Sequence, residues 1–124
     1  MNETPMNDSR CPIDHEHLTD MSAGDTEFET ELMQEFLRVT PPLIEQVENA
    51  LATGDLPTVE RAAHTLKGSC RSLGARPMSD PCETLEKMAR AGETTGANEV
   101  VQNIQAYFDV LTDYITKTWG VRAA

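Results

Sequence analysis

The 124-residue sequence has no run of about 18 apolar residues, so no segment is long and apolar enough to cross a bilayer as a helix. Its opening, MNETPMNDSR, lacks the basic start and the apolar stretch of a signal peptide. Basic residues are also few: 10 Lys and Arg stand against 21 Asp and Glu, a formal net charge of −11. Because phosphate binding needs a cationic surface, this charge disfavours nucleic acids and acidic membranes as partners.

Cysteine is scarce as well. The three cysteines, Cys11, Cys70 and Cys82, are odd in number and widely spaced, which argues against a disulfide framework and indicates a reducing compartment. The length suffices for one domain with a hydrophobic core and is too short for two. We therefore expect a single cytoplasmic domain, monomeric, with Cys70 and Cys82 as small core residues.

Strand signals are nearly absent, since aromatic residues make up 5% of the chain and no stretch alternates apolar and polar residues. Apolar residues instead recur at helical spacing in five segments, bounded by capping residues, prolines and glycines. We expect these helices to start at Thr26, Thr40, Asp55, Asp80 and Thr95, and to end near Val39, Gly54, Gly74, Gly92 and Gly120. Residues 13–21 allow a further short helix.

The connections between these segments are only a few residues long, which places successive helices antiparallel. The predicted fold is all-α: an up-down antiparallel four-helix bundle with an additional short N-terminal helix. We expect the bundle to occupy residues 13–120, after an acidic flexible tail at 1–12 and before a short C-terminal tail at 121–124.

Positive charge is concentrated in residues 61–79, which hold four basic residues and no acid. On a wheel of 100° per residue, His64 points about 130° away from the centre of the apolar stripe of its helix. It should therefore reach solvent, in a sector shared with the residues Arg61, Lys67, Gly68 and Arg71. This placement argues against the alternative of a satisfied core histidine.

Gly68 lies one helical turn after His64 on the same surface. A glycine inside a helix costs about 0.5–1 kcal/mol relative to alanine, so its presence needs a reason. One reason is access, because the missing side chain lets another molecule reach the imidazole. The alternative is a close helix crossing, which the outward direction of Gly68 disfavours.

An accessible imidazole beside a lysine suits nucleophilic attack on phosphorus. Neutral imidazole is a competent nucleophile near neutral pH, and Lys67 can place a compact positive charge against phosphoryl oxygens. The sequence shows no nucleotide-binding loop and no metal-ligand cluster beside them. We therefore expect the chain to supply the acceptor group of a reaction that needs a partner protein, without an autonomous catalytic site of its own.

Around His64 the sequence reads Ala63-His64-Thr65-Leu66-Lys67-Gly68-Ser69 and continues with Leu73-Gly74-Ala75. This run resembles the signature of histidine-containing phosphotransfer (HPt) domains. The resemblance extends through Cys82, Leu85 and Glu86, and the pairs Gly54-Asp55 and Ala91-Gly92 also look like positions of that family. It covers most of residues 13–119.

The resemblance implies a four-helix bundle whose exposed histidine shuttles phosphoryl groups between receiver domains in a two-component phosphorelay, with a sensor or hybrid histidine kinase upstream. His64 would be the phosphorylated residue, Lys67 would assist the phosphoryl oxygens, and Gly68 would leave room for the partner. Glu86 falls where some members have a glutamine that binds the imidazole. The basic residues Arg61, Arg71 and Arg90 would join the partner-binding surface. The receiver would bring Mg²⁺, so this chain is expected to bind no cofactor.

Three other hypotheses stand beside this one. The chain could bind receivers without transferring phosphate, which an intact His64, Lys67 and Gly68 disfavour. It could be the phospho-accepting domain of a larger hybrid kinase. A zinc site formed by Cys11, His15 and His17 is disfavoured, because the two histidines would point in opposite directions on a helix and no second pair of ligands follows.

Overall fold

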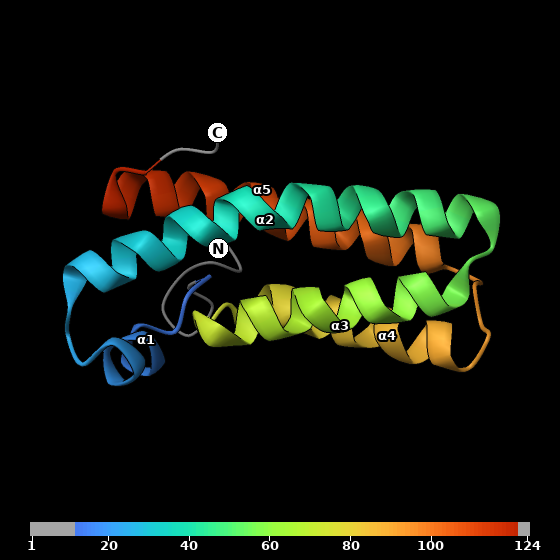
Figure 1. The fold of residues 1–124 in the computed structure, drawn as a ribbon, viewed down its shortest axis with the longest axis horizontal. Coiled ribbons are helices and arrows are strands. Elements are labelled where there is room, and N and C mark those ends of the chain that lie inside the picture. The colour runs from blue at the N-terminus through green and yellow to red at the C-terminus, as the bar shows by residue number, and fades with distance from the viewer. Residues whose placement is uncertain (1–11, 122–124) are drawn as a thin grey trace, which may run out of the picture.

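The structure, a computed structural model, describes residues 12–121, which form helices joined by short turns and include no strand. The helices are α1 (His15–Ser22), α2 (Thr26–Thr53), α3 (Leu56–Ser72), α4 (Arg76–Arg90) and α5 (Ala97–Trp119). Figure 1 shows α2 and α5 in one layer and α3 and α4 in the other, with α1 at one end. Contacts close the ring α2–α3–α4–α5, which confirms the all-α four-helix bundle with a short extra helix at its N-terminal side. No described helix is both long and apolar enough to span a membrane.

The turn from α2 to α3 forms as its sequence predicts. Gly54 ends α2 in the left-handed conformation at φ 77°, which glycine adopts without steric cost. The Asp55 side chain then caps α3 by accepting a hydrogen bond from the backbone N–H of Thr58. These two residues fix where α3 begins, and with it the angular position of His64.

The predicted helix boundary at Thr40-Pro41 is wrong, because α2 runs through both prolines as one helix of 28 residues. Thr40 is buried inside the helix, where its hydroxyl donates to the carbonyl of Phe36 at 2.7 Å. Pro41 and Pro42 lie on the exposed side, where water can satisfy the carbonyls that lose an N–H partner. The buried residues Met33, Phe36, Leu37, Thr40, Ile44, Val47 and Ala50 keep one helical phase across the prolines, so continuous packing outweighs the local break.

Three predicted helix starts also need correction. Asp25, not Thr26, caps α2 by accepting from the backbone N–H groups of Glu27 and Phe28. Helix α4 begins at Arg76 rather than Asp80, and α5 begins at Ala97 rather than Thr95. Pro77 suits the first turn of a helix, and burial of Met78 and Ser79 draws that earlier turn into α4.

The short helix α1 is held against the turn between α3 and α4. The backbone N–H of Asp14 donates to the carbonyl of Gly74 at 2.8 Å. Gly74 has φ 76°, and a Cβ there would lie 2.9 Å from the Asp14 carbonyl oxygen, so glycine is required. Pro12 and Val121 are buried. The packed unit therefore includes Pro12 and Val121, which the predicted tails at 1–12 and 121–124 had left out of it, while residues 1–11 and 122–124 lie outside the described residues.

Candidate functional site

His64 lies in the middle of α3 with 68% of its side chain exposed. Its helix buries Val59, Ala63 and Leu66 completely in the core. The apolar stripe is therefore turned inward and the imidazole outward, which confirms the direction given by the helical wheel.

A buried carboxylate holds one nitrogen of the imidazole. Glu86, which α4 places opposite His64, has a side chain only 5% exposed, and its Oε2 lies 2.9 Å from His64 Nδ1. An ionised carboxylate only accepts hydrogen bonds, so Nδ1 carries the proton and donates to it. In the neutral ring this leaves Nε2 unprotonated, and Nε2 has no hydrogen-bond partner among the described residues. The arrangement presents a free lone pair to solvent.

Two cations keep the Glu86 carboxylate ionised. Lys67 Nζ lies 2.7 Å from Oε1, and an Arg90 guanidinium nitrogen donates to Oε2 at 2.9 Å. The close contact with the Lys67 ammonium group is the main cause that holds the pKa of Glu86 below its usual range; burial opposes this, and His64 adds to the lowering. Arg90 also pairs with Glu60 at 2.9 Å and so ties α4 back to α3.

The sequence predicts that Lys67 faces solvent beside His64, but the structure places it mostly buried. Its side chain is only 15% exposed and its ammonium group faces Glu86. Glu86 thus brings together His64, Lys67 and Arg90 at one buried carboxylate. The sequence placed Glu86 beside the imidazole only by resemblance, with Arg90 as a nearby compensating charge, and gave no sign of the ion pair between Glu86 and Lys67.

Gly68 is exposed, and a Cβ added to it would meet no atom within 4 Å. This excludes a close helix crossing as the reason for the glycine. Open space therefore lies beside His64, one turn along α3.

Comparisons with known proteins agree with this geometry. Residues 31–116, more than half of the chain, match the family model described as Hpt domain. The chain belongs to the Hpt domain family. It is also similar to two Escherichia coli (strain K12) proteins: Sensor protein TorS, 44% identical over 46 residues, and Phosphotransferase RcsD, 29% identical over 72 residues. These matches cover 37% and 58% of this chain, which spans only 5% and 8% of the two relatives.

A solved structure shares the fold of this Hpt domain. It is the histidine-containing phosphotransfer protein B (HptB) from Pseudomonas aeruginosa PAO1, with a TM-score of 0.83 and 21% sequence identity. The likeness covers 89% of this chain and 96% of that one. At that identity the likeness establishes the helical architecture alone.

The other predicted partner-binding arginines lie apart from Glu86. Arg61 is exposed and donates to the Thr58 hydroxyl, at 3.3 Å. Arg71, two turns after His64, pairs with Glu83 at 3.1 Å while about half exposed. Both reach solvent, and their role toward a partner stays a prediction.

The residues considered for zinc are not brought together in the part of the chain that the structure describes. The ring of His15 stacks on Trp119 with centroids 5.8 Å apart and bonds to the Tyr114 hydroxyl, whereas His17 lines a separate hollow. Cys11 lies outside the described residues. Cys70 and Cys82 are free and buried in the core. The neighbouring Cys82 thiol and burial raise the pKa of Cys70, so the Cys70 thiol is not poised to react.

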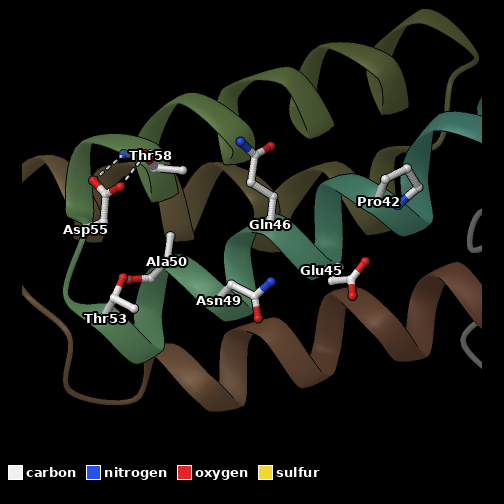
Figure 2. A pocket seen from close by; sticks show the side chains of 8 residues that line it. All are labelled: Pro42, Glu45, Gln46, Asn49, Ala50, Thr53, Asp55 and Thr58. Atoms are coloured by element: carbon white, nitrogen blue, oxygen red, sulfur yellow. Dashed lines mark hydrogen bonds between the residues drawn. The ribbon is translucent and has the colours of Figure 1, made fainter.

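A shallow polar hollow of about 430 Å³ lies between α2 and the start of α3 (Figure 2). Its lining includes Glu45, Gln46 and Asn49 from α2, and Figure 2 shows the Asp55 carboxylate turned to Thr58 in the helix cap rather than free for a ligand. His64 is not part of this lining. This hollow is therefore separate from the site at His64.

Substitution of Gly68 separates stability from access. We expect Gly68→Ala to stabilise the protein by up to about 1 kcal/mol, or roughly 3–5 °C in Tm, because the backbone there is helical and the methyl group meets open space. Transfer to a receiver should slow, and Gly68→Gln should slow it further because the longer side chain lies beside the imidazole. Thermal melts and transfer rates on both variants test this; a cooperative melt at clearly lower temperature for Gly68→Ala would contradict it.

Proposed function

We propose that this Hpt domain accepts a phosphoryl group on Nε2 of His64 from the aspartyl phosphate of a receiver domain and passes it to a response regulator. One observation carries the assignment: an exposed imidazole whose Nδ1 is held by the buried carboxylate of Glu86. That hydrogen bond favours the tautomer with a free lone pair on Nε2 and limits rotation of the ring. Both effects are what a nucleophile on a rigid helix needs.

The transfer balances without an added reactant. The Nε2 lone pair attacks phosphorus, a phosphorus–nitrogen bond forms, and the phosphorus–oxygen bond to the receiver aspartate breaks. The aspartate leaves as a carboxylate, while Nδ1 keeps its proton and continues to donate to Glu86. The phosphorylated ring then carries positive charge next to an ionised carboxylate, which stabilises it. By the same reaction in reverse, His64 passes the phosphoryl group on to a second receiver.

The proposed transfer needs a metal ion to neutralise the phosphoryl oxygens, and this requirement indicates the kind of partner. Residues 12–121 hold no group of three or more His, Cys, Asp or Glu suited to a metal ion, so the receiver would supply the Mg²⁺ that neutralises the phosphoryl oxygens. We propose receiver domains and a sensor or hybrid histidine kinase as partners of a monomeric protein. The free thiols of Cys70 and Cys82 fit a reducing compartment such as the cytoplasm.

Incubation with a phosphorylated receiver domain tests the proposal. We expect the protein to gain phosphate that is labile in acid and stable in base, as a phosphoramidate bond is, and a chelator to stop the transfer. Binding of the receiver without any labelling would favour the interaction module instead. Labelling that is stable in acid would place the phosphate on another residue type.

Lys67→Ala should slow transfer from a receiver about tenfold without abolishing it, because Lys67 already shares its charge with Glu86 and the receiver's metal carries the larger part of the stabilisation. The matched control is Lys117→Ala, which removes an exposed lysine paired with Asp113 on α5. Single-turnover transfer rates measure the effect. An unchanged transfer rate for a fully folded Lys67→Ala variant would contradict a role for the Lys67 charge.

A further inference from the structure

A chain of contacts runs from Glu60 to His64 by way of α4. Glu60 lies one turn before His64 on α3. Its carboxylate accepts a hydrogen bond from Arg90 Nε at 2.9 Å. Arg90 Nη2 then donates to Glu86 Oε2, and the same oxygen lies 2.9 Å from His64 Nδ1. Glu60 is the one member of this chain to which the proposed transfer gives no role.

Glu60 decides where the guanidinium group of Arg90 lies. The Arg90 side chain is 58% exposed, so packing does not fix it. Two nitrogens of its planar guanidinium group donate to two different carboxylates. The hydrogen bond to Glu60 is the largest cause that holds the pKa of Arg90 above its usual range, ahead of the contact with Glu86. Glu60 is therefore the main anchor of this arginine.

The position of Arg90 matters because its guanidinium group and the imidazole share one oxygen atom. Glu86 Oε2 accepts from both, and the carboxylate is buried. An arginine released from Glu60 gains side-chain freedom in water, so its contact with Glu86 becomes less frequent. Oε2 then loses one of the two donors that fix its direction toward His64 Nδ1.

We propose that Glu60 is a positioning residue for phosphoryl transfer: it anchors Arg90 on Oε2 of Glu86 and, through that carboxylate, keeps the imidazole of His64 in its reactive orientation. This inference rests on the proposed function. It adds a residue whose hydrogen bond goes to Arg90 rather than to the imidazole. Orientation of the nucleophile thus depends on residues two contacts away from the ring.

Glu60→Ala tests the proposal with phosphoramidate as the phosphoryl donor, because so small a donor needs no docked receiver. We expect labelling to slow about fourfold, and Glu60→Gln to recover most of the rate, since its amide oxygen can still accept from Arg90 Nε. The matched control is Glu83→Ala, which removes a carboxylate of equal exposure (35% against 36%) that joins α4 to α3 through Arg71. The control should keep the rate within about twofold, and all three variants should melt within a few degrees of the unchanged protein, because exposed ion pairs add little stability.

A double substitution separates action through Arg90 from a direct effect of the Glu60 charge. In an Arg90→Ala background, Glu60→Ala should change the labelling rate by less than about 1.5-fold, because the two residues act in one chain. A full loss in that background, or equal losses for Glu60→Gln and Glu60→Ala, would overturn the proposal in favour of a direct effect of the charge. An unchanged rate for Glu60→Ala would overturn it as well.

A second measurement does not depend on transfer. In NMR spectra of the neutral ring, the Nδ1 proton of His64 should exchange with water severalfold faster in Glu60→Ala than in the unchanged protein or in Glu83→Ala, because its acceptor is less well held. Equal exchange rates would overturn the positioning role even in a protein that takes up phosphate normally. Failure of the unchanged protein to take phosphate from phosphoramidate or from any receiver overturns the proposed function, whereas the proton exchange still shows whether Glu60 positions the imidazole.

Discussion

His64→Gln abolishes phosphoryl acceptance and leaves the fold intact: this is the largest effect we expect. In the proposed transfer the imidazole is the nucleophile, and an amide cannot form the phosphorus–nitrogen bond. The side chain is 68% exposed, so its loss removes little packing. Glutamine also suits a helix and can still donate a hydrogen bond to Glu86. The Tm should therefore stay within a few degrees of that of the unchanged protein.

Parallel melts and transfer assays measure the two halves of this prediction. The control is His15→Gln, which removes another exposed histidine and should still be labelled even if loss of its contact with Trp119 lowers the Tm. Persistent acid-labile phosphate on His64→Gln at normal stability would show that another residue is the acceptor. Loss of labelling with a collapsed melt would instead be a failure of folding, and would contradict the placement of His64 on the surface.

Replacement of Glu86 should have the second largest effect, on stability and on transfer together. Glu86→Ala leaves Lys67, whose side chain is only 15% exposed, without its counter-charge. We expect a loss of about 2–3 kcal/mol, or roughly 10 °C in Tm. Transfer should fall about tenfold or more, because the ring loses the acceptor that selects its tautomer and orientation.

Glu86→Gln should separate the effect on stability from the effect on transfer. The amide oxygen can still accept from His64 Nδ1, so transfer should be largely kept, while part of the stability is lost with the charge. The folded state lowers the pKa of Glu86, chiefly through Lys67, so its stabilising contribution is complete above the unfolded pKa near 4.5 and is lost as the pH falls through the lower folded pKa. Denaturant melts between about pH 6 and 3 should show a shallower acid loss in Glu86→Gln. An equally steep loss in both proteins would contradict the ion pair.

The difference between the two proteins is the informative quantity in that comparison. Asp55, Glu83 and Glu93 also have lowered pKa values, and each contributes to acid destabilisation in both. Their shared contribution cancels when the two pH profiles are subtracted. The remaining difference between the two profiles is the contribution of the Glu86 charge to stability.

The sequence by itself determined the all-helical character of the chain and the outward direction of His64. Helical periodicity is a local property, and it predicted the inward stripe of α3, the outward direction of His64 and the open side of Gly68, all of which the structure confirms. The caps at Gly54 and Asp55 are local for the same reason, since their conformations and hydrogen bonds involve neighbours in the chain. Local signals failed where packing opposed them, at Thr40-Pro41 and at the start of α4.

Only the tertiary structure decided how the imidazole of His64 is held. Glu86 meets His64 and Lys67 because α3 and α4 pack in one particular register, and no spacing within a single helix specifies that register. The long stem of Lys67 lets its ammonium group turn from the edge of the apolar stripe to the buried carboxylate, a choice made by burial and charge across two helices.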